Sequence, residues 1–222
     1  MVSSEKSTAR PAKRKRTRRS QEERRTETAS RHLNAALELL LEGGYSHFRI
    51  ASAAKRAGTS RGGQTYHFGT KMDLIEKAIE TEFQNEVTQN QATASNTGRS
   101  DILRRGAEHT KAFLAGKLFR VCVNMLISMR PSNPLAEKVR SISVRSREPI
   151  EAAWIDRLIE AGADPETAKE AFWLLWNVQR GIATQKNIGG DPGGSDDILD
   201  FTVDLLNDYV RSKSSALRID AT

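Results

Sequence analysis

Apolar residues recur at helical spacing along this sequence, and no stretch alternates apolar and polar residues as a half-buried strand does. The first stripe occupies positions i, i+3, i+4, i+7 and i+8 of one helix face: Leu33, Ala36, Leu37, Leu40 and Leu41. We expect this helix to begin near Glu22 and to end at Gly43-Gly44, because glycine favours the backbone conformation at which helices stop. The pattern predicts an all-α protein.

Two short helical segments and one long helix follow. The first short segment has the apolar stripe Ile50, Ala53, Ala54 and Ala57 and is closed by Gly58, and the second spans residues 61–68. After Gly69-Thr70, a long helix carries one apolar face: Leu74, Ile75, Ala78, Ile79, Phe83 and Val87. A short helix, a tight glycine turn and another short helix form a helix-turn-helix, here over residues 49–68.

The rest of the chain predicts a helical body. Residues 91–100 are small and polar and indicate a loop, whereas nine of the twelve residues in 118–129 are apolar. A helix that is apolar nearly all round is buried on most sides, so we expect 118–129 to be the spine of this body. Another helix is predicted from Leu135, ended or kinked by Pro149, with its apolar pattern continuing to Gly162.

Local start signals predict the last two helices. Residues 164–166 (Asp-Pro-Glu) combine an N-cap residue, a proline at the first helical position and an acid in the first turn. The helix they open ends at Gly189-Gly190. Ser195 is expected to cap the final helix, whose first turn holds Asp196 and Asp197.

The excess positive charge of the chain lies entirely at its N-terminal end. Residues 1–31 hold 11 Lys and Arg against 4 Asp and Glu, and the remainder holds 24 of each sign. Residues 1–21 contain nothing apolar enough to bury a core, so we expect a disordered basic arm. Such an arm suits a polyanion such as DNA, because Lys and Arg release counterions from phosphates. The alternative is a solvated tail that aids solubility.

Several classes of protein are excluded by what the sequence lacks. Cys122 is the sole cysteine, so no intrachain disulfide can form, and no apolar run is long enough for a membrane span. No HExxH, GxSxG, P-loop or dinucleotide fingerprint occurs, and the four histidines do not cluster with Cys122 as metal ligands. We therefore expect no catalytic residues, no metal and no cofactor, and a cytoplasmic location.

The second short helix of the helix-turn-helix is the predicted recognition helix. In such motifs this helix enters the major groove and its first residues reach base edges. Here those residues are Arg61, Gly62, Gly63 and Gln64. Arginine can bind guanine, and glutamine adenine, through two hydrogen bonds. The glycines suit a backbone that approaches the duplex closely.

Residues 27–86 resemble the DNA-binding domain of the tetracycline-repressor (TetR) family. The resemblance rests on the Gly44-Tyr45 exit and on the run AxxAGTSRGxxxYHFGTKxDL over residues 54–74. It implies a dimer whose recognition helices enter successive major grooves, with Gly63 and Thr65 towards the bases and Tyr66, His67 and Lys71 on phosphates. Three positions depart from the family pattern: Arg49, Ala51 and Thr65.

The predicted DNA contacts combine the arm with the recognition segment. In the arm they are Lys13, Arg14, Lys15, Arg16, Arg18 and Arg19. In the recognition segment and just beyond it they are Ser60, Arg61, Gly62, Gly63, Gln64, Thr65, Tyr66, His67 and Lys71. The alternative is that residues 66–68 only pack at the end of a three-helix module and that Arg61 is a solvated charge.

The expected organisation is an arm over 1–21, a DNA-binding domain over 22–86, and a ligand-binding and dimerisation body over 87–222. Candidate ligand-pocket residues are Phe113, Phe119, Met125, Met129, Trp154, Phe172, Trp173 and Trp176. Aromatic and Met stripes at helical spacing also fit plain core. His109 and Arg120 are candidates to orient a polar or anionic ligand. Residues 166–188 and 195–211 resemble the helices that pair in dimers of the family.

The sequence thus predicts a ligand-responsive transcriptional regulator. Its expected partners are double-stranded operator DNA, a small-molecule effector and a second copy of the chain, with no membrane. We expect it to act as a repressor that the effector releases from the operator. The alternative is an architectural DNA-binding protein that senses nothing, which a solid core in the body would favour.

Overall fold

The computed structural model describes residues 21–59, 68–190 and 193–219, with side chains as far as residue 214. Within this part of the chain every regular element is helical, which confirms the predicted all-α class. The elements are α1 (Gln21–His47), α2 (Ile50–Arg56), α4 (Lys71–Ser95), the 3-10 turn η1 (Arg99–Asp101), α5 (Ile102–Ala115), α6 (Lys117–Ser128), α7 (Pro134–Glu160), α8 (Pro165–Gly189) and α9 (Ser195–Ile219). In the described residues, no helix is long and apolar enough to cross a membrane.

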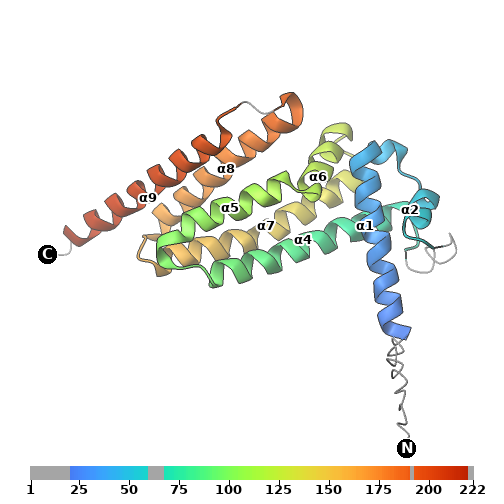
Figure 1. Cartoon of the computed structure of the whole chain (residues 1–222), viewed down its shortest axis with the longest axis horizontal. Coiled ribbons are helices and arrows are strands. Elements are labelled where there is room, and N and C mark those ends of the chain that lie inside the picture. The colour runs from blue at the N-terminus through green and yellow to red at the C-terminus, as the bar shows by residue number, and fades with distance from the viewer. Residues whose placement is uncertain (1–20, 60–67, 191–192, 220–222) are drawn as a thin grey trace, which may run out of the picture.

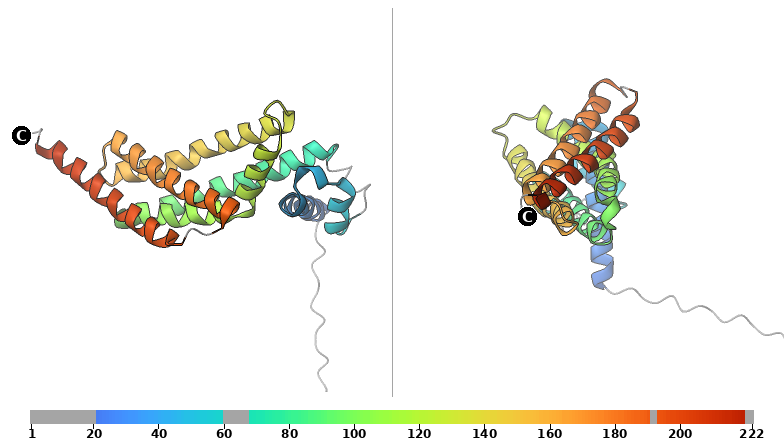
Figure 2. Two further views of the ribbon diagram at one scale, coloured as in Figure 1. Left: turned by 90° about the horizontal axis from the view of Figure 1, so that it is seen from above. Right: turned by 90° about the vertical axis from the view of Figure 1, so that its left-hand side faces the viewer.

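The molecule is elongated, with α1 and α2 at one end of a long helical bundle (Figure 1). The helices α4 and α7 run side by side in the same direction, as shown by the ion pair of Glu76 with Lys138 and the hydrogen bond of Asn90 with Trp154. The helices α8 and α9 form an antiparallel pair along one side of the bundle (Figures 1 and 2). The helix α4 therefore links the predicted DNA-binding end, formed by α1 and α2, to the body.

Local signals set several helix ends as predicted. Asp164 accepts hydrogen bonds from the backbone N–H groups of Glu166 and Thr167, both at 3.1 Å, and Pro165 follows it at the first helical position. The helical backbone of α1 is interrupted at Gly44, where φ is +66°, a conformation that favours glycine. One further turn, ending at His47, follows that interruption.

The predicted loop at 91–100 is wrong for its first half, because α4 continues to Ser95. Ala94 is buried in the core, so packing holds this last turn. Small polar residues are tolerated there because their side chains bond backbone carbonyls one turn back. Thr93 donates to Gln89 at 2.8 Å, and Ser95 donates to Gln91 at 2.8 Å.

The helix does not end at Pro149, since α7 runs without a break from Pro134 to Glu160. Buried residues lie on both sides of the proline: Leu135, Val139, Ile142, Ile150, Trp154 and Leu158. Their packing against the rest of the bundle holds the helix together although proline removes one of its backbone hydrogen bonds.

The expectation that residues 118–129 form a buried spine is also wrong. The spine consists of the longer α4 and α7, and α6 is buried on one side only, through Leu118, Val121, Cys122 and Met125. Ile127 is largely exposed, and Phe119, Val123 and Leu126 are half-buried. Phe119, Val123 and Leu126 are apolar for another reason, because they line a cavity in the body.

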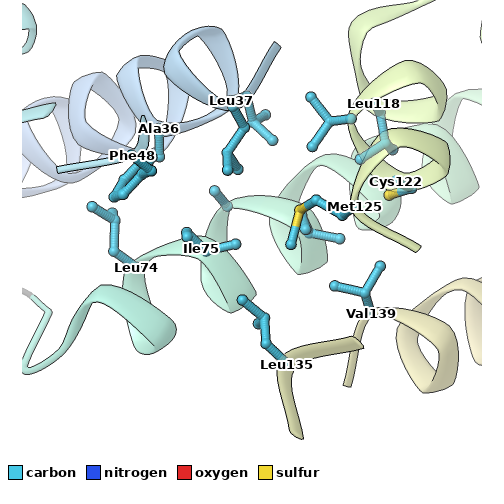
Figure 3. Packing of buried hydrophobic residues seen from close by; sticks show 14 of the residues in the cluster. Ala36, Leu37, Phe48, Leu74, Ile75, Leu118, Cys122, Met125, Leu135 and Val139 are labelled. Atoms are coloured by element: carbon cyan, nitrogen blue, oxygen red, sulfur yellow. The ribbon is translucent and has the colours of Figure 1, made fainter. Parts of the chain in front are cut away.

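The core consists of two clusters of buried side chains. The first joins α1 and the segment after it to α4, α6 and α7, as Figure 3 shows for Leu37, Phe48, Leu74, Met125 and Leu135. The second lies farther along the body, among α4, α5, α7, α8 and α9. The predicted DNA-binding end is therefore packed directly onto the body.

Candidate DNA-binding surface and ligand cavity

The turn of the predicted helix-turn-helix is built around Gly58. Its φ of +68° turns the chain sharply after α2, and glycine takes this conformation without strain. The N–H of Gly58 donates to Lys55 at 3.1 Å, and that of Thr59 donates to Ala54 at 3.0 Å. The predicted recognition residues Ser60, Arg61, Gly62, Gly63, Gln64, Thr65, Tyr66 and His67 lie outside the described residues.

His32 of α1 contacts both flanks of this segment and was missed by the sequence reasoning. Its side chain is fully buried, and its Nε2 lies 2.6 Å from the Thr59 hydroxyl. Its ring also meets the ring of Phe68 edge-on, with 6.1 Å between ring centres. His32 therefore fixes the positions at which the chain leaves α2 and approaches α4.

The helix α2 is fastened to α1 by a paired charge. Both terminal nitrogens of Arg56 donate to the Glu42 carboxylate, at 2.7 and 2.8 Å. This hydrogen bonding lowers the pKa of Glu42. Arg49 makes no side-chain cap on α2 and instead donates to the backbone carbonyl of Ser46 at 2.7 Å.

Lys71, a predicted phosphate contact, lies at the junction of α1 and α4. Its ammonium donates to the Tyr45 carbonyl at 2.8 Å and lies 3.8 Å from the centre of the Tyr45 ring. The pKa of Lys71 is lowered, mainly by partial burial and to a smaller extent by repulsion from Arg49. An ammonium has three N–H donors, so this bond leaves others for a phosphate.

The predicted contacts of the basic arm, Lys13, Arg14, Lys15, Arg16, Arg18 and Arg19, also lie outside the described residues. The structure begins at Gln21, and the first turns of α1 expose two further arginines, Arg24 and Arg25. Glu22, Glu23 and Glu27 balance Arg24, Arg25 and Arg31 in this stretch, so the net positive charge of the N-terminal end belongs to the arm before α1.

A cavity of about 310 Å³ lies between α4, α5, α6, α7 and α8. Its lining is mainly apolar and comprises Phe83, Phe113, Phe119, Cys122, Val123, Leu126, Arg140, Ser143, Val144, Arg147, Ile150, Trp176, Arg180 and Thr184. Three predicted pocket residues, Phe113, Phe119 and Trp176, are among them. Burial raises the pKa of the Cys122 thiol to about 12, so this thiol stays protonated.

The other predicted pocket residues are placed elsewhere. Met125 and Met129 belong to the core cluster between α1 and the body. Trp154 and Phe172 line a much smaller space of about 10 Å³. Trp173 donates from its indole to Glu151 at 2.8 Å.

Comparison with known proteins identifies the chain. Residues 33–78 match the family model described as bacterial regulatory proteins of the tetR family. The HTH-type transcriptional regulator CymR of Pseudomonas putida is 30% identical over 169 residues, which are 76% of this chain and 83% of CymR. The chain belongs to the TetR family of transcriptional regulators.

Solved structures share the fold of this TetR-family regulator. A TetR family transcription regulator from Marinobacter aquaeolei VT8 has a TM-score of 0.61 at 16% identity, covering 85% of this chain and 98% of its own. The FadR regulator of Bacillus subtilis, in complex with stearoyl-CoA, has a TM-score of 0.59 at 16% identity, covering 80% and 96%. The predicted family and fold class are confirmed.

Three arginines at the cavity of the TetR-family regulator were also missed by the sequence reasoning. Arg140 and Arg147 come from α7 and Arg180 from α8. The Arg147 guanidinium lies 4.9 Å from the Trp173 ring centre, and that of Arg180 lies 5.7 Å from the Trp176 ring centre. The pKa of Arg180 is lowered, mainly by burial and to a smaller extent by repulsion from Arg147.

A second cavity of about 370 Å³ lies between α5, α6, α8 and α9 of the regulator, and its lining includes Arg120 and Gln179. Gln179 is buried, and neither atom of its amide has a hydrogen-bond partner among the described residues. His109 lies outside both cavity linings and acts electrostatically on the half-buried Glu86. No metal-binding group of His, Cys, Asp or Glu occurs in the described part of the chain.

Proposed function

We propose that this TetR-family regulator is a homodimeric repressor that a small molecule in the 310 Å³ cavity releases from operator DNA. One observation carries the proposal: adjacent sides of α6 contact the cavity and the DNA-binding end, and Cys122 contacts both. Phe119, Val123 and Leu126 line the cavity, whereas Leu118 and Met125 pack in the cluster that includes α1. This double contact accounts for the apolar residues of α6 other than the exposed Ile127.

The proposed DNA contacts are the arm and the recognition segment, namely Lys13, Arg14, Lys15, Arg16, Arg18, Arg19, Ser60, Arg61, Gly62, Gly63, Gln64, Thr65, Tyr66, His67 and Lys71. Arg61 is proposed to read a base, whereas the arm contacts phosphates regardless of sequence. The tight turn at Gly58 and the contacts of His32 with Thr59 and Phe68 support this assignment, because they position the flanks of the segment.

The proposed dimer interface is the outer face of α8 and α9. Five large apolar side chains are exposed there, namely Leu174, Ile188, Ile198, Phe201 and Leu205. An exposed apolar face of this extent favours burial against a partner. A two-fold axis through this face would pair the same helices of both copies, so that each chain presents one recognition segment.

The proposed mechanism is a shift between two conformations. Half-sites in successive major grooves require recognition helices about 34–36 Å apart. A ligand that fits the cavity better when α6 is displaced favours another spacing, because α6 is packed on α1. The resulting loss of DNA affinity equals the difference in ligand affinity between the two conformations, typically about 1–3 kcal/mol.

Selection of bound sequences from random duplex DNA by the purified full-length protein tests the DNA-binding part. The expected result is a two-fold symmetric site whose half-sites lie about one helical turn apart. Recovery of no preferred sequence would refute it. An open cavity beside α6 supports ligand sensing over the architectural alternative, which predicts a solid body.

A further inference from the structure

We propose that the effector is a small anion with an apolar body, and that its acidic group is bound by Arg147 and Arg180. This inference rests on the proposed function, since it takes the 310 Å³ cavity beside α6 as the effector site. It assigns a chemical class to the ligand from the charges and shape of the cavity wall.

The charged residues of the cavity wall are all cationic. Arg140, Arg147 and Arg180 line it, and no Asp or Glu belongs to the lining that the structure describes. Two of these charges are partly compensated from outside, because Arg140 pairs with Glu137 and Arg147 lies 3.8 Å from Glu151. That last distance exceeds a hydrogen bond, and the buried Nε of Arg147 has no hydrogen-bond partner in the described residues.

Arg180 is the least compensated of the three. It has no carboxylate partner in the described part of the chain, and its guanidinium lies over the Trp176 ring. Arg147 repels it, and both guanidinium groups are partly withdrawn from water. Two like charges held near each other beside an apolar cavity are stabilised by an anion between them. A planar guanidinium is well suited to a carboxylate, which it binds with two hydrogen bonds.

The rest of the cavity requires an apolar ligand body. Phe113 meets the rings of Phe83 and Phe119 with centres 6.2 Å apart in each pair, and that of Trp176 at 6.1 Å. The volume of about 310 Å³ is at the lower end of the roughly 300–1,000 Å³ usual for ligand sites. A single ring system or a short alkyl chain therefore fits better than a long acyl chain.

This arrangement gives the two parts of the ligand different contacts. The acidic group would join α7 to α8 through Arg147 and Arg180, while the apolar body would touch Phe119 and Val123 of α6. The anion would thus provide affinity and orientation, and the body would provide the contact with α6 that changes DNA binding.

Calorimetric titration of the full-length protein with matched acid and amide pairs tests the inference. The probes are benzoate, naphthoate and octanoate, each compared with its neutral amide in low-chloride buffer. At least one acid is expected to bind about tenfold or more tightly than its amide, because hydrogen bonds between charged groups contribute most to such a preference. Equal binding within all three pairs, or no binding by any acid, would overturn the proposal.

Variants locate the anion and separate this inference from the proposed function. Arg180→Gln is expected to remove the acid preference, Arg180→Lys to restore part of it, and Arg145→Gln to leave it unchanged, since Arg145 is exposed and lies outside the cavity lining. An unchanged preference in Arg180→Gln, with its helicity intact by circular dichroism, would refute the assignment.

A cavity-filling variant provides a second way to distinguish failure of the anion assignment from failure of the proposed effector site. Val123→Trp is expected to abolish binding of acids and amides together, since the indole occupies the space between α6 and α7. If acids and amides bind equally and both are lost in this variant, the effector site stands and only the anion assignment fails. If both bind undiminished in Val123→Trp, the cavity is not the ligand site and the proposed function loses its support.

Discussion

Replacing Phe201 with aspartate is expected to dissociate the proposed dimer. Phe201 is 68% exposed on α9, and Ile198 and Leu205 are exposed one turn before and after it on the same helix face. If this face is the interface, two copies of Phe201 lose their exposed area on dimerisation, one from each chain.

The magnitude follows from the exposed area. Complete burial of a Phe side chain contributes about 1.5–3 kcal/mol, so burial of the remaining two-thirds contributes about 1–2 kcal/mol. Two copies give about 2–4 kcal/mol, which corresponds to a rise of roughly 30- to 1,000-fold in the dimer dissociation constant. The introduced carboxylate adds to this effect, because it would be desolvated without a partner.

Sedimentation velocity over a dilution series measures this change, and Ile127→Asp is a matched control. Ile127 is 71% exposed, similar to Phe201, but lies on α6. The control is expected to stay dimeric at concentrations at which Phe201→Asp is monomeric. Equal dissociation constants for Phe201→Asp and the wild type would refute the interface on α8 and α9.

Three further predictions concern the DNA-binding end. Removing residues 1–20 should weaken binding to all DNA and flatten its salt dependence, whereas an unchanged slope would make the arm a simple tail. Arg61→Ala should cost about 1–3 kcal/mol on the preferred site only, and an equal loss on random DNA would assign it to phosphate. His32→Ala should lower the free energy of unfolding by about 2–4 kcal/mol in urea titration, because it leaves a cavity and removes the bond to Thr59. A loss below about 0.5 kcal/mol would contradict the anchoring role of His32.

The parts of the fold that the sequence predicted well depend on local signals. The Asp164-Pro165 start of α8 and the turn at Gly58 are each encoded within a few neighbouring residues. Where tertiary packing outweighs local preference, the predictions failed. The small polar end of α4 stays helical because Ala94 is buried, and α7 passes through Pro149 because it packs on both sides of it.

The same distinction between local and long-range signals holds for the candidate sites. The DNA-binding motif was recognisable because it is one contiguous run, over residues 54–74. The cavity charges come from α7 and α8, and nothing in the sequence around Arg147 or Arg180 indicates that they share a wall. The link between His32 and Thr59 spans 27 positions and is equally invisible before folding.

The apolar character of α6 shows how one pattern has two physical causes. Residues 118–129 look like a buried spine because nearly every side chain is apolar. One part of that surface packs in the core cluster that includes α1, and another part lines a cavity. Periodicity reports that a surface avoids water, but it does not distinguish a protein neighbour from a ligand.

The coupling between cavity and operator is tested most directly by measuring ligand affinity with and without DNA. Linkage requires that a ligand which weakens operator binding is itself bound more weakly by the operator complex, by the same factor. With the tightest-binding acid of the panel and the selected operator, the account predicts a rise of about fivefold or more in the ligand dissociation constant. An identical ligand affinity for free and operator-bound protein would contradict it.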